Sequence, residues 1–284
     1  MTIYEDILRD RQDMTNWLLH FTRNSKDGNA RDVLRSILVE GAIRPGFASR
    51  KNKDGLLRPT VYGPTPAVCF TEQPLKAFVQ YLSSRNDPEA MAGYGIVIHK
   101  HDVYVAGGLP VIYGLQRVKE MSSTDQGYDP ERRLLYPEYI PLDLQYRYMA
   151  FVPTGREPKD WTHEREWRWP ANVYHGEPKG LFYLGPNRYT NNNGIFEGRI
   201  HAVVYSNADI SWLQRQLTDD FKREKVGQVP SPHSERKPYS SFWREHLGDV
   251  RIISLEEIRK NPTRSEFWRF DDWPDEYKYP LILK

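Results

Sequence analysis

Three short stretches with the pattern of β-strands, each carrying polar side chains near one end, constrain the fold of this chain more than any other feature of its sequence. They lie at 16–22, 67–72 and 162–170 and carry His20-Phe21-Thr22, Thr71-Glu72 and Glu164-Arg165-Glu166. Runs of this length bounded by turn residues are typical of β-strands. Runs of similar character lie at 94–100, 109–113, 146–152, 181–184, 200–205 and 250–254. The sequence therefore predicts many short strands.

Helical signals are fewer, and they lie between the predicted strands. Asn29 is placed as an N-cap, and an apolar stripe follows that Gly41 is expected to end. Apolar residues also recur with helical spacing at 75–84 and 210–221, and Ser254 and Glu257 have the spacing of a capping box. A leading helix is expected at 6–13, although this segment is polar. The chain is predicted to be of the α+β class.

The composition bounds the size and the setting of the protein. With 284 residues, of which 39% are hydrophobic, the chain can bury a substantial core. The segment 1–6 carries acids where a signal peptide would need positive charge, and no stretch approaches the roughly 20 apolar residues of a membrane span. A cytoplasmic protein without membrane association is expected. The tail, which contains Trp268, Phe270, Trp273, Tyr277 and Tyr279, is expected to pack back on the body.

Several kinds of site are excluded or disfavoured by the residues present. Cys69 is the only cysteine, so an intrachain disulfide and a cysteine-rich metal site are excluded, and its apolar strand favours a core thiol. His99 and His101 have no matching ligands nearby in sequence, so no metal site is predicted. No phosphate-binding Walker loop, dinucleotide-binding glycine motif or nucleophile elbow is present.

Two basic, proline-broken loops give the chain local positive charge, although its net charge is only +2. The loop at 44–60 has five basic residues and one acid, and the loop at 222–238 has five and two. Such loops can hold phosphates, while most charged runs are simply solvated. Aromatic residues make up 13% of the chain, and their rings can form core or stack on bases.

The stretch 162–170 carries the most specific chemistry. If it is one strand, Glu164, Glu166 and Arg168 share a face because side chains alternate. Two carboxylates this close should raise the pKa of one of them in a buried setting, unless Arg168 compensates. Paired carboxylates in a cleft are candidates for acid–base work, and the alternative is a charged strand with a solvated face.

The order of these motifs resembles a known group of proteins. A strand ending in His-Phe-Thr is followed by Leu-x-x-Ile-Leu-x-x-Gly, a basic loop, Cys-Phe-Thr-Glu before Pro-Leu, and later Glu-x-Glu-Trp-Arg. This order is similar to that of AbiGi-like phage abortive-infection proteins. More distantly it resembles ADP-ribosyltransferases of the His-Tyr-Glu type, including the DarT-like enzymes that modify nucleic acid. The resemblance covers roughly residues 17–205, and about twenty positions carry it.

The resemblance implies a split β-sandwich of the ADP-ribosyltransferase type, with helices packed on the sheets and NAD as co-substrate. It implies a single domain over 1–284, with an insertion at 114–145 and an aromatic C-terminal extension at 261–284. Glu166 would be the catalytic glutamate and Glu164 the second acid. The NAD-binding residues that it implies are His20, Phe21, Thr22, Arg44, Thr71 and Tyr81, with Tyr94 and Tyr113 as competitors of Tyr81 for stacking on nicotinamide.

The chemistry suits these residue types. Cleavage of the nicotinamide–ribose bond develops positive charge on the sugar, which a carboxylate bonded to the ribose stabilises, and a second carboxylate can deprotonate the acceptor. The loop at 44–60 could close over the pyrophosphate and exclude water. The expected activity is that of a toxin or antiphage defence effector acting on nucleic acid, with RNA favoured over DNA, and with an antitoxin protein as a partner.

Three other functions stay open at this point. A protein could be the acceptor of ADP-ribose instead of a nucleic acid. The chain could also be a non-catalytic member of the same fold that binds a nucleotide or a partner. Transfer of an RNA 2'-phosphate to NAD is a less favoured function, since that chemistry relies on His and Arg and not on a glutamate pair.

Overall fold

The protein, described here from a computed structural model, has a mixed α+β fold whose contacts divide the chain into two compact units. Unit 1 comprises 1–42, 72–105 and 183–284, and unit 2 comprises 43–71 and 106–182. The residues that the structure describes are 11, 13–24, 28–51, 57–85, 92–114, 118–152, 160–171, 180–185, 190–191, 194–225, 243, 245–267 and 272–281.

A mixed sheet organises unit 1, with its strands in the order β16-β15-β14-β6-β1. Strands β14 and β15 are parallel, and the other neighbours in this order are antiparallel. The central strand β6 is a continuous apolar run that is buried along most of its length, as expected for a strand covered on both faces. The strands of unit 1 are β1 (Trp17–Phe21), β6 (Gly95–His99), β12 (Thr190–Asn191), β13 (Gly194–Ile195), β14 (Ile200–Val204), β15 (Arg251–Ser254) and β16 (Tyr279–Pro280).

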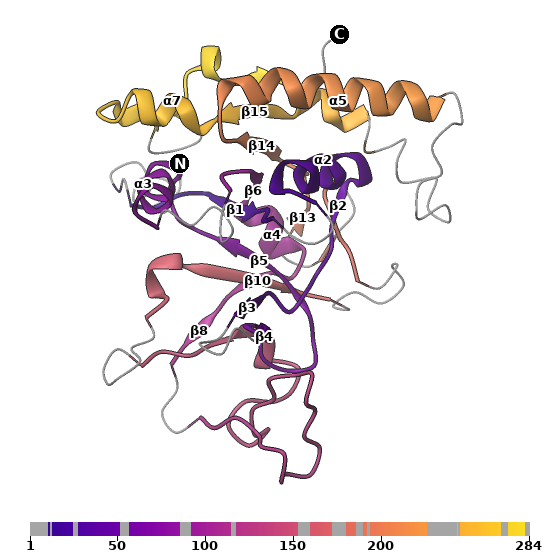
Figure 1. Ribbon diagram of the computed structural model, residues 1–284, viewed down its shortest axis with the longest axis vertical. Helices are drawn as coiled ribbons and strands as arrows, with labels where there is room; N and C mark the ends of the chain where they lie inside the picture. The colour runs from indigo at the N-terminus through magenta and orange to yellow at the C-terminus, as the bar shows by residue number, and fades with distance from the viewer. Residues whose placement is uncertain are drawn as a thin grey trace. The chain divides into compact units, whose positions relative to one another are not determined.

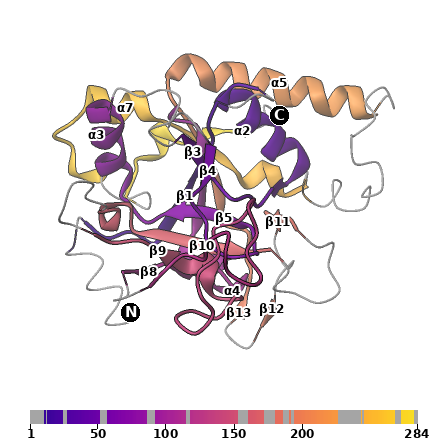
Figure 2. The same cartoon turned by 60° about the horizontal axis from the view of Figure 1, so that its bottom comes forward.

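Helices pack on this sheet and on one another. Figure 1 shows α5 and α7 beside β15, and Figure 2 shows α2 beside α5, where Arg35 pairs with Asp220. The helices of unit 1 whose bounds lie within the described residues are α2 (Ala30–Glu40), α3 (Leu75–Arg85), α4 (Lys100–Val105), α5 (Asn207–Lys225) and α7 (Leu255–Lys260). Its short 3-10 turns are η4 (Leu247–Asp249), η5 (Ser265–Phe267) and η6 (Asp275–Tyr277).

Both predicted ends of α2 and the predicted start of α7 at Ser254 are confirmed, although the Glu257 side chain accepts from Asn207. The Asn29 side chain accepts the Asp32 backbone N–H, and Gly41 ends α2 in the left-handed conformation with φ of 66°. Ser254 caps α7 by accepting the Glu256 N–H. Trp273 is buried in the core of unit 1 and Tyr277 packs against it, which confirms that part of the tail folds back, whereas Trp268 and Phe270 lie outside the described residues.

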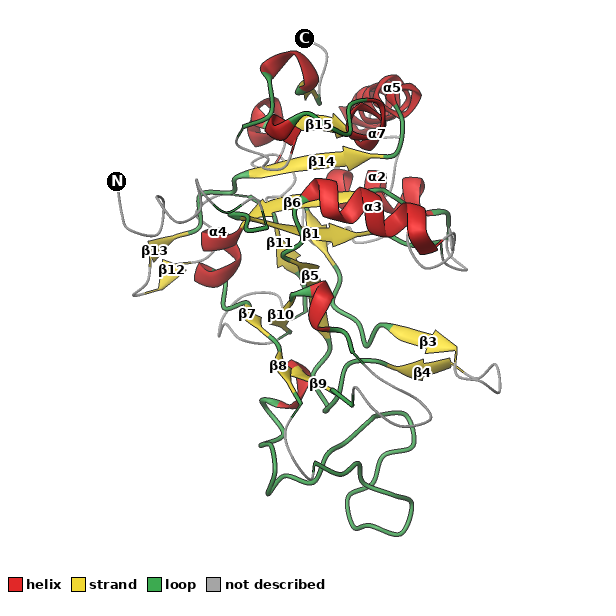
Figure 3. Cartoon of the chain, turned by 90° about the vertical axis from the view of Figure 1, so that its left-hand side faces the viewer, coloured by secondary structure: helices red, strands yellow, loops and turns green. Residues whose placement is uncertain are grey.

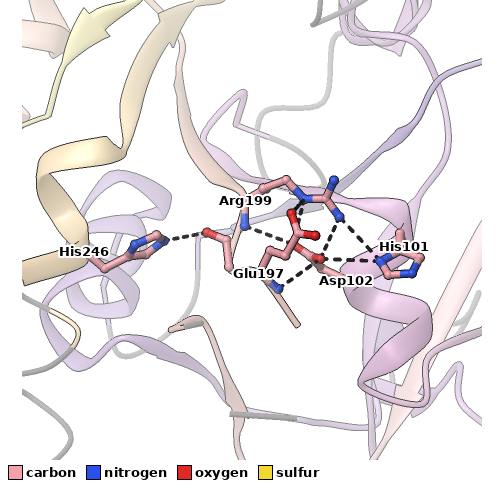
Figure 4. A network of polar contacts seen from close by, with 6 residues as sticks. His101, Asp102, Glu197, Arg199 and His246 are labelled. Carbon is pink, nitrogen blue, oxygen red and sulfur yellow. Dashed lines mark hydrogen bonds and ion pairs between the residues drawn. The ribbon is translucent and has the colours of Figure 1, made fainter. Parts of the chain in front are cut away.

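A buried carboxylate ties α4 to the segment that precedes β14. Asp102 is 0% exposed and accepts hydrogen bonds from the backbone N–H groups of Glu197 and Arg199 and from the Arg199 guanidinium, whose Nη2 lies 2.9 Å from Oδ1 (Figure 4). His101 lies at the exposed edge of this network. A buried charge with this many donors is satisfied, so it fixes the segment instead of destabilising it.

Replacing Asp102 should therefore destabilise unit 1. Asp102→Asn removes the buried charge that two backbone N–H groups and the Arg199 guanidinium share, while Arg199 keeps its pair with Glu197, and we expect a loss of about 3 kcal/mol in the free energy of unfolding. Urea denaturation measures it, with Asp249→Asn as the control because that side chain is 81% exposed. Equal stabilities of the two variants would contradict this role.

Two histidines that are held neutral flank Trp17 in the same unit. The rings of His99 and His201 lie 5.2 and 5.3 Å from the Trp17 ring. Burial is the main cause that lowers the pKa of His99 to about 4 and that of His201 to about 3. The His201 Nδ1 accepts the Arg251 backbone N–H, which fits a neutral ring.

Acid should destabilise unit 1 through these rings. In the unfolded chain a histidine binds a proton below about pH 6.5, but the folded ring of His201 does not until about pH 3, so stability is lost as the pH falls between these values. As the pH falls from 7 to 5, each of the two rings lowers the free energy of unfolding by about 2 kcal/mol. His201→Asn retains a hydrogen-bond acceptor but cannot bind this proton. Between pH 7 and pH 5 its free energy of unfolding, measured by urea denaturation, should fall by about 2 kcal/mol less than that of the wild type. Parallel pH dependences of the two proteins would contradict this role of His201.

Unit 2 contains a second group of paired strands. Strand β10 lies between β5 and β7 and is antiparallel to both. Strands β3 and β4 form a hairpin, and β8 and β9 pair in parallel (Figure 3). The strands of unit 2 are β3 (Ser49–Lys51), β4 (Leu57–Pro59), β5 (Ala67–Thr71), β7 (Leu109–Pro110), β8 (Ile112–Tyr113), β9 (Tyr148–Met149) and β10 (Glu166–Pro170), and its 3-10 turns are η1 (Gln145–Arg147) and η2 (Thr162–Glu164).

The predicted insertion, residues 114–145, lies between the two parallel strands β8 and β9. A parallel pair needs a crossover connection of about a dozen residues or more, and this segment supplies it. Its described part, 118–144, consists of turns and one isolated bridge (Figure 3). The fully buried Gln145 side chain bonds the backbone of Leu135 and Ile140, and the segment packs against Tyr62 and Tyr148. The insertion is thereby fixed to β9.

A close backbone approach at Gly63 supports the same anchor. Gly63 has a φ of +83°, and a Cβ at this position would lie 2.7 Å from the Cβ of Gln145. Its N–H donates to the Arg133 carbonyl. Only glycine combines this conformation with this contact.

The structure corrects several predicted elements. The basic loop at 44–60 contains the β3–β4 hairpin, and the strand predicted at 146–152 is reduced to β9 after η1. Helix α4 follows β6, where no helix was predicted because Val103 and Val105 are residue types that favour strands. In the structure both side chains are buried from the helix. Two short strands, β2 (Ala42–Ile43) and β11 (Phe182–Tyr183), lie at unit boundaries. Most of the predicted leading helix and residues 226–238 of the second basic loop lie outside the described residues.

Among the described residues, no helix is both long enough and apolar enough to cross a membrane. The arrangement of the strands as an ADP-ribosyltransferase sandwich and the division into one domain with two additions stay predictions.

Candidate functional site in unit 2

The stretch 162–170 is not a single strand, which corrects the predicted placement of Glu164. Thr162–Glu164 forms the turn η2, Arg165 is left-handed with φ of 44°, and β10 begins at Glu166. Of the three residues predicted to share a face, only Glu166 and Arg168 lie on β10. A left-handed residue other than glycine costs about 1–2 kcal/mol, so the surrounding contacts must hold this turn in place.

Glu166 and Arg168 form a buried ion pair at the start of β10. Glu166 is 8% exposed and Arg168 is 1% exposed. The Arg168 Nε lies 2.8 Å from Oε1 of Glu166, and its Nη2 lies 3.2 Å from Oε2. Burial alone would lower the pKa of Arg168, but the Glu166 carboxylate outweighs it and holds that pKa above its usual value. Arg168 therefore supplies the compensating charge.

The third nitrogen of the Arg168 guanidinium, Nη1, donates hydrogen bonds to the backbone next to the insertion. Its Nη1 donates to the carbonyls of Tyr146, at 2.6 Å, and of Tyr148, at 3.2 Å. The guanidinium is thus bonded on one side to a carboxylate and on the other to η1 and β9. A fork of donors in fixed geometry suits arginine and not lysine.

A tyrosine hydroxyl holds the backbone of Glu166. The Glu166 N–H donates to the Tyr113 hydroxyl at 2.9 Å. Burial raises the pKa of Tyr113 to about 12, so the hydroxyl is neutral at physiological pH. Tyr113 was predicted only as a competitor for stacking on nicotinamide. Its hydrogen bond to the backbone of Glu166 was not predicted.

Three of the predicted site residues come together beside this ion pair. Thr71, the last residue of β5, is paired in register with Glu166, and its hydroxyl donates to the Glu164 backbone carbonyl. Thr71, Glu164 and Glu166 therefore lie at one end of the β5–β10 ladder. Arg44, a fourth predicted residue in unit 2, is exposed directly after β2.

The other four predicted residues belong to unit 1. His20 and Phe21 end β1, and Phe21 stacks on Phe78 of α3 with ring centroids 3.5 Å apart. Tyr81 packs against the same apolar cluster. The hydroxyl of Thr22 donates to the carbonyls of Ala30 and Tyr94, so this buried side chain supports the end of β1. Their role in binding NAD stays a prediction.

No family model matches the chain, and no curated protein and no solved structure matches it either.

The coupling of Glu166 to the insertion was the part of the site that the sequence did not predict. Alternation along a strand places Arg168 two residues from Glu166 on the same face, and this spacing did carry the signal for the ion pair. The carbonyls of Tyr146 and Tyr148 have no signature in sequence, because every residue carries a backbone carbonyl.

The ion pair makes a prediction about stability. Glu166→Gln leaves a buried guanidinium without a counter-charge, and Arg168→Met leaves a buried carboxylate without its cation, so each should cost about 3–5 kcal/mol. In the double variant neither charge remains, and its loss should fall short of the sum of the single losses by at least about 1 kcal/mol. Urea denaturation of the four proteins measures this coupling, and strictly additive losses would contradict it.

Proposed function

We propose that the chain is an NAD-dependent ADP-ribosyltransferase in which Glu166 is the reacting carboxylate. The observation that supports this best is the fixed geometry of Glu166, whose two carboxylate oxygens and backbone N–H are each held by a hydrogen bond, beside Thr71 and Glu164. A preorganised charge costs no reorganisation when positive charge develops on a bound sugar.

The pairing with Arg168 leaves Glu166 able to bond a substrate. An ionised carboxylate offers about four acceptor positions, and Arg168 occupies two of them. A ribose hydroxyl can take another. When the bond between nicotinamide and ribose breaks, its electron pair leaves with nicotinamide, and Glu166 stabilises the resulting ribosyl cation. The acceptor nucleophile then bonds to the anomeric carbon.

Glu164 is assigned the second role in this reaction, namely removal of a proton from the acceptor. It lies on η2, and the left-handed Arg165 separates it from Glu166. Strained residues of this kind cluster at functional sites, which adds support to this stretch of the chain. In unit 2, Thr71 and Arg44 are proposed to bind NAD, with Arg44 as a cation for the pyrophosphate.

The acceptor and the biological role are proposed from the resemblance and the composition. Nucleic acid, with RNA favoured, is the proposed acceptor, and the proposed role is that of a toxin or antiphage effector that an antitoxin restrains. A protein acceptor is the alternative within the same activity.

A non-catalytic binding protein is the second candidate function, and one observation favours it. Both oxygens of Glu166 bond a fully buried guanidinium, which is also the arrangement of a purely structural ion pair. The two functions differ in whether NAD is consumed.

Incubation of the protein with NAD labelled in the adenylate, together with separate pools of RNA, DNA and protein, tests the proposal. We expect label to enter one of the three pools, and RNA is the pool that the proposal favours. Glu166→Gln should reduce the rate at least about 100-fold per folded molecule, as expected for loss of a charge that stabilises the transition state. The folded fraction must be measured in parallel because this variant also weakens the ion pair.

Arg11→Gln serves as the matched control, because Arg11 bonds Asp13 at an exposed position and lies outside the proposed site. It should keep the wild-type rate. If the wild-type protein consumes no NAD with any pool or with a cell extract, the enzymatic proposal fails and the binding function is favoured.

A further inference from the structure

Glu166 is held directly by Tyr113 and, through Arg168, by two backbone carbonyls, and these groups lie where the chain enters and leaves the insertion. Tyr113, whose hydroxyl accepts the Glu166 N–H, is the last residue of β8, where the chain enters the insertion. Tyr146 and Tyr148, whose carbonyls accept from Arg168, lie in η1 and β9, where the chain leaves it. The two strands pair in register, Ile112 with Tyr148 and Tyr113 with Met149.

The β8–β9 pair therefore fixes both parts of Glu166. A shift of β8 moves the acceptor of the Glu166 N–H, and a shift of η1 or β9 moves the carbonyls that orient Arg168. The guanidinium is planar and 1% exposed, so it transmits the position of these carbonyls to the carboxylate with little freedom. The carboxylate cannot change its position without breaking one of these bonds.

The insertion is in turn rigidly joined to this pair of strands. Gln145 precedes Tyr146 and bonds the insertion at Leu135 and Ile140 through three hydrogen bonds of 2.7–3.0 Å. Leu135 and Ile140 also pack with Tyr148 in one apolar cluster. The surface of the insertion exposes large apolar side chains, at Tyr128, Tyr139, Leu142 and Leu144.

We propose that Arg168 and Tyr113 are positioning residues for Glu166, and that through them the insertion at 114–145 sets the geometry of the reacting carboxylate. This inference rests on the proposed function and deepens it. Neither residue is assigned contact with the substrate. Each acts by holding Glu166, and the β8–β9 pair is the support that they share.

A test must separate positioning from folding, because Arg168 is buried and charged. Two quantities do so, namely the number of NAD molecules bound per chain, from calorimetry, and kcat per bound NAD. A structural role lowers the stoichiometry of binding and leaves kcat per bound NAD unchanged. A positioning role lowers kcat per bound NAD while the stoichiometry and the Kd stay close to the wild-type values.

Tyr113→Phe removes one hydroxyl and keeps the ring, so it is the mildest variant. We expect kcat per bound NAD to fall about 10-fold, since a misplacement well below 1 Å is enough for such a loss. Arg168→Lys keeps the charge but loses the planar arrangement of donors, and we expect its kcat per bound NAD to fall about 100-fold. Arg168→Met should fall further, so that lysine gives partial rescue relative to methionine.

Arg147→Lys is the matched control. Arg147 lies in η1 beside Tyr146 and Tyr148, but its guanidinium donates to the Pro110 carbonyl and not to Glu166. We expect kcat per bound NAD to stay within twofold of the wild type.

The outcomes distinguish the two levels of the account. If Glu166→Gln abolishes turnover while Tyr113→Phe and Arg168→Lys keep kcat per bound NAD within twofold, the positioning inference is overturned and the proposed function stands. If Glu166→Gln keeps wild-type turnover, the assignment of Glu166 itself fails, and the inference fails with it.

Discussion

The buried ion pair between Glu166 and Arg168 is the interaction on which the account of unit 2 depends. Removing two charges from water is costly, and their attraction offsets that cost only where the geometry is good and the remaining donors are bonded. Each of the three guanidinium nitrogens is bonded here, to two carboxylate oxygens and two backbone carbonyls in total. Such a pair fixes the position of a charge more firmly than it stabilises the fold, and a fixed charge is what a developing sugar cation requires.

The same principle recurs in unit 1 with a different consequence. Asp102 and Arg199 also form a pair in which the acid is fully buried, but there the donors include two backbone N–H groups of the segment that leads into β14. That pair fastens a loop to a helix. The Glu166 pair instead lies at a strand start, between the β5–β10 ladder and the insertion, where it links separate elements of unit 2.

Much of the local structure could be predicted from sequence, and the failures have physical causes. Asn29 and Gly41 set the ends of α2 because capping and left-handed conformations depend on single residue types. The stretch at 162–170 was misjudged because alternation of polar and apolar residues cannot reveal a left-handed residue such as Arg165. Thr71 beside Glu166 was predicted only as a neighbouring strand end, and their register is a tertiary fact.

The most direct test of the central claim is a crystal structure of the Glu164→Gln variant with NAD bound. Glu164 is the proposed proton acceptor, so its loss should slow consumption of the dinucleotide and leave Glu166 and Arg168 in place. The account predicts an oxygen of Glu166 within about 2.6–3.2 Å of a hydroxyl of the nicotinamide ribose, with the Arg168 bonds unchanged. A nicotinamide ribose bound far from Glu166, with that carboxylate bonded to Arg168 alone, would contradict it.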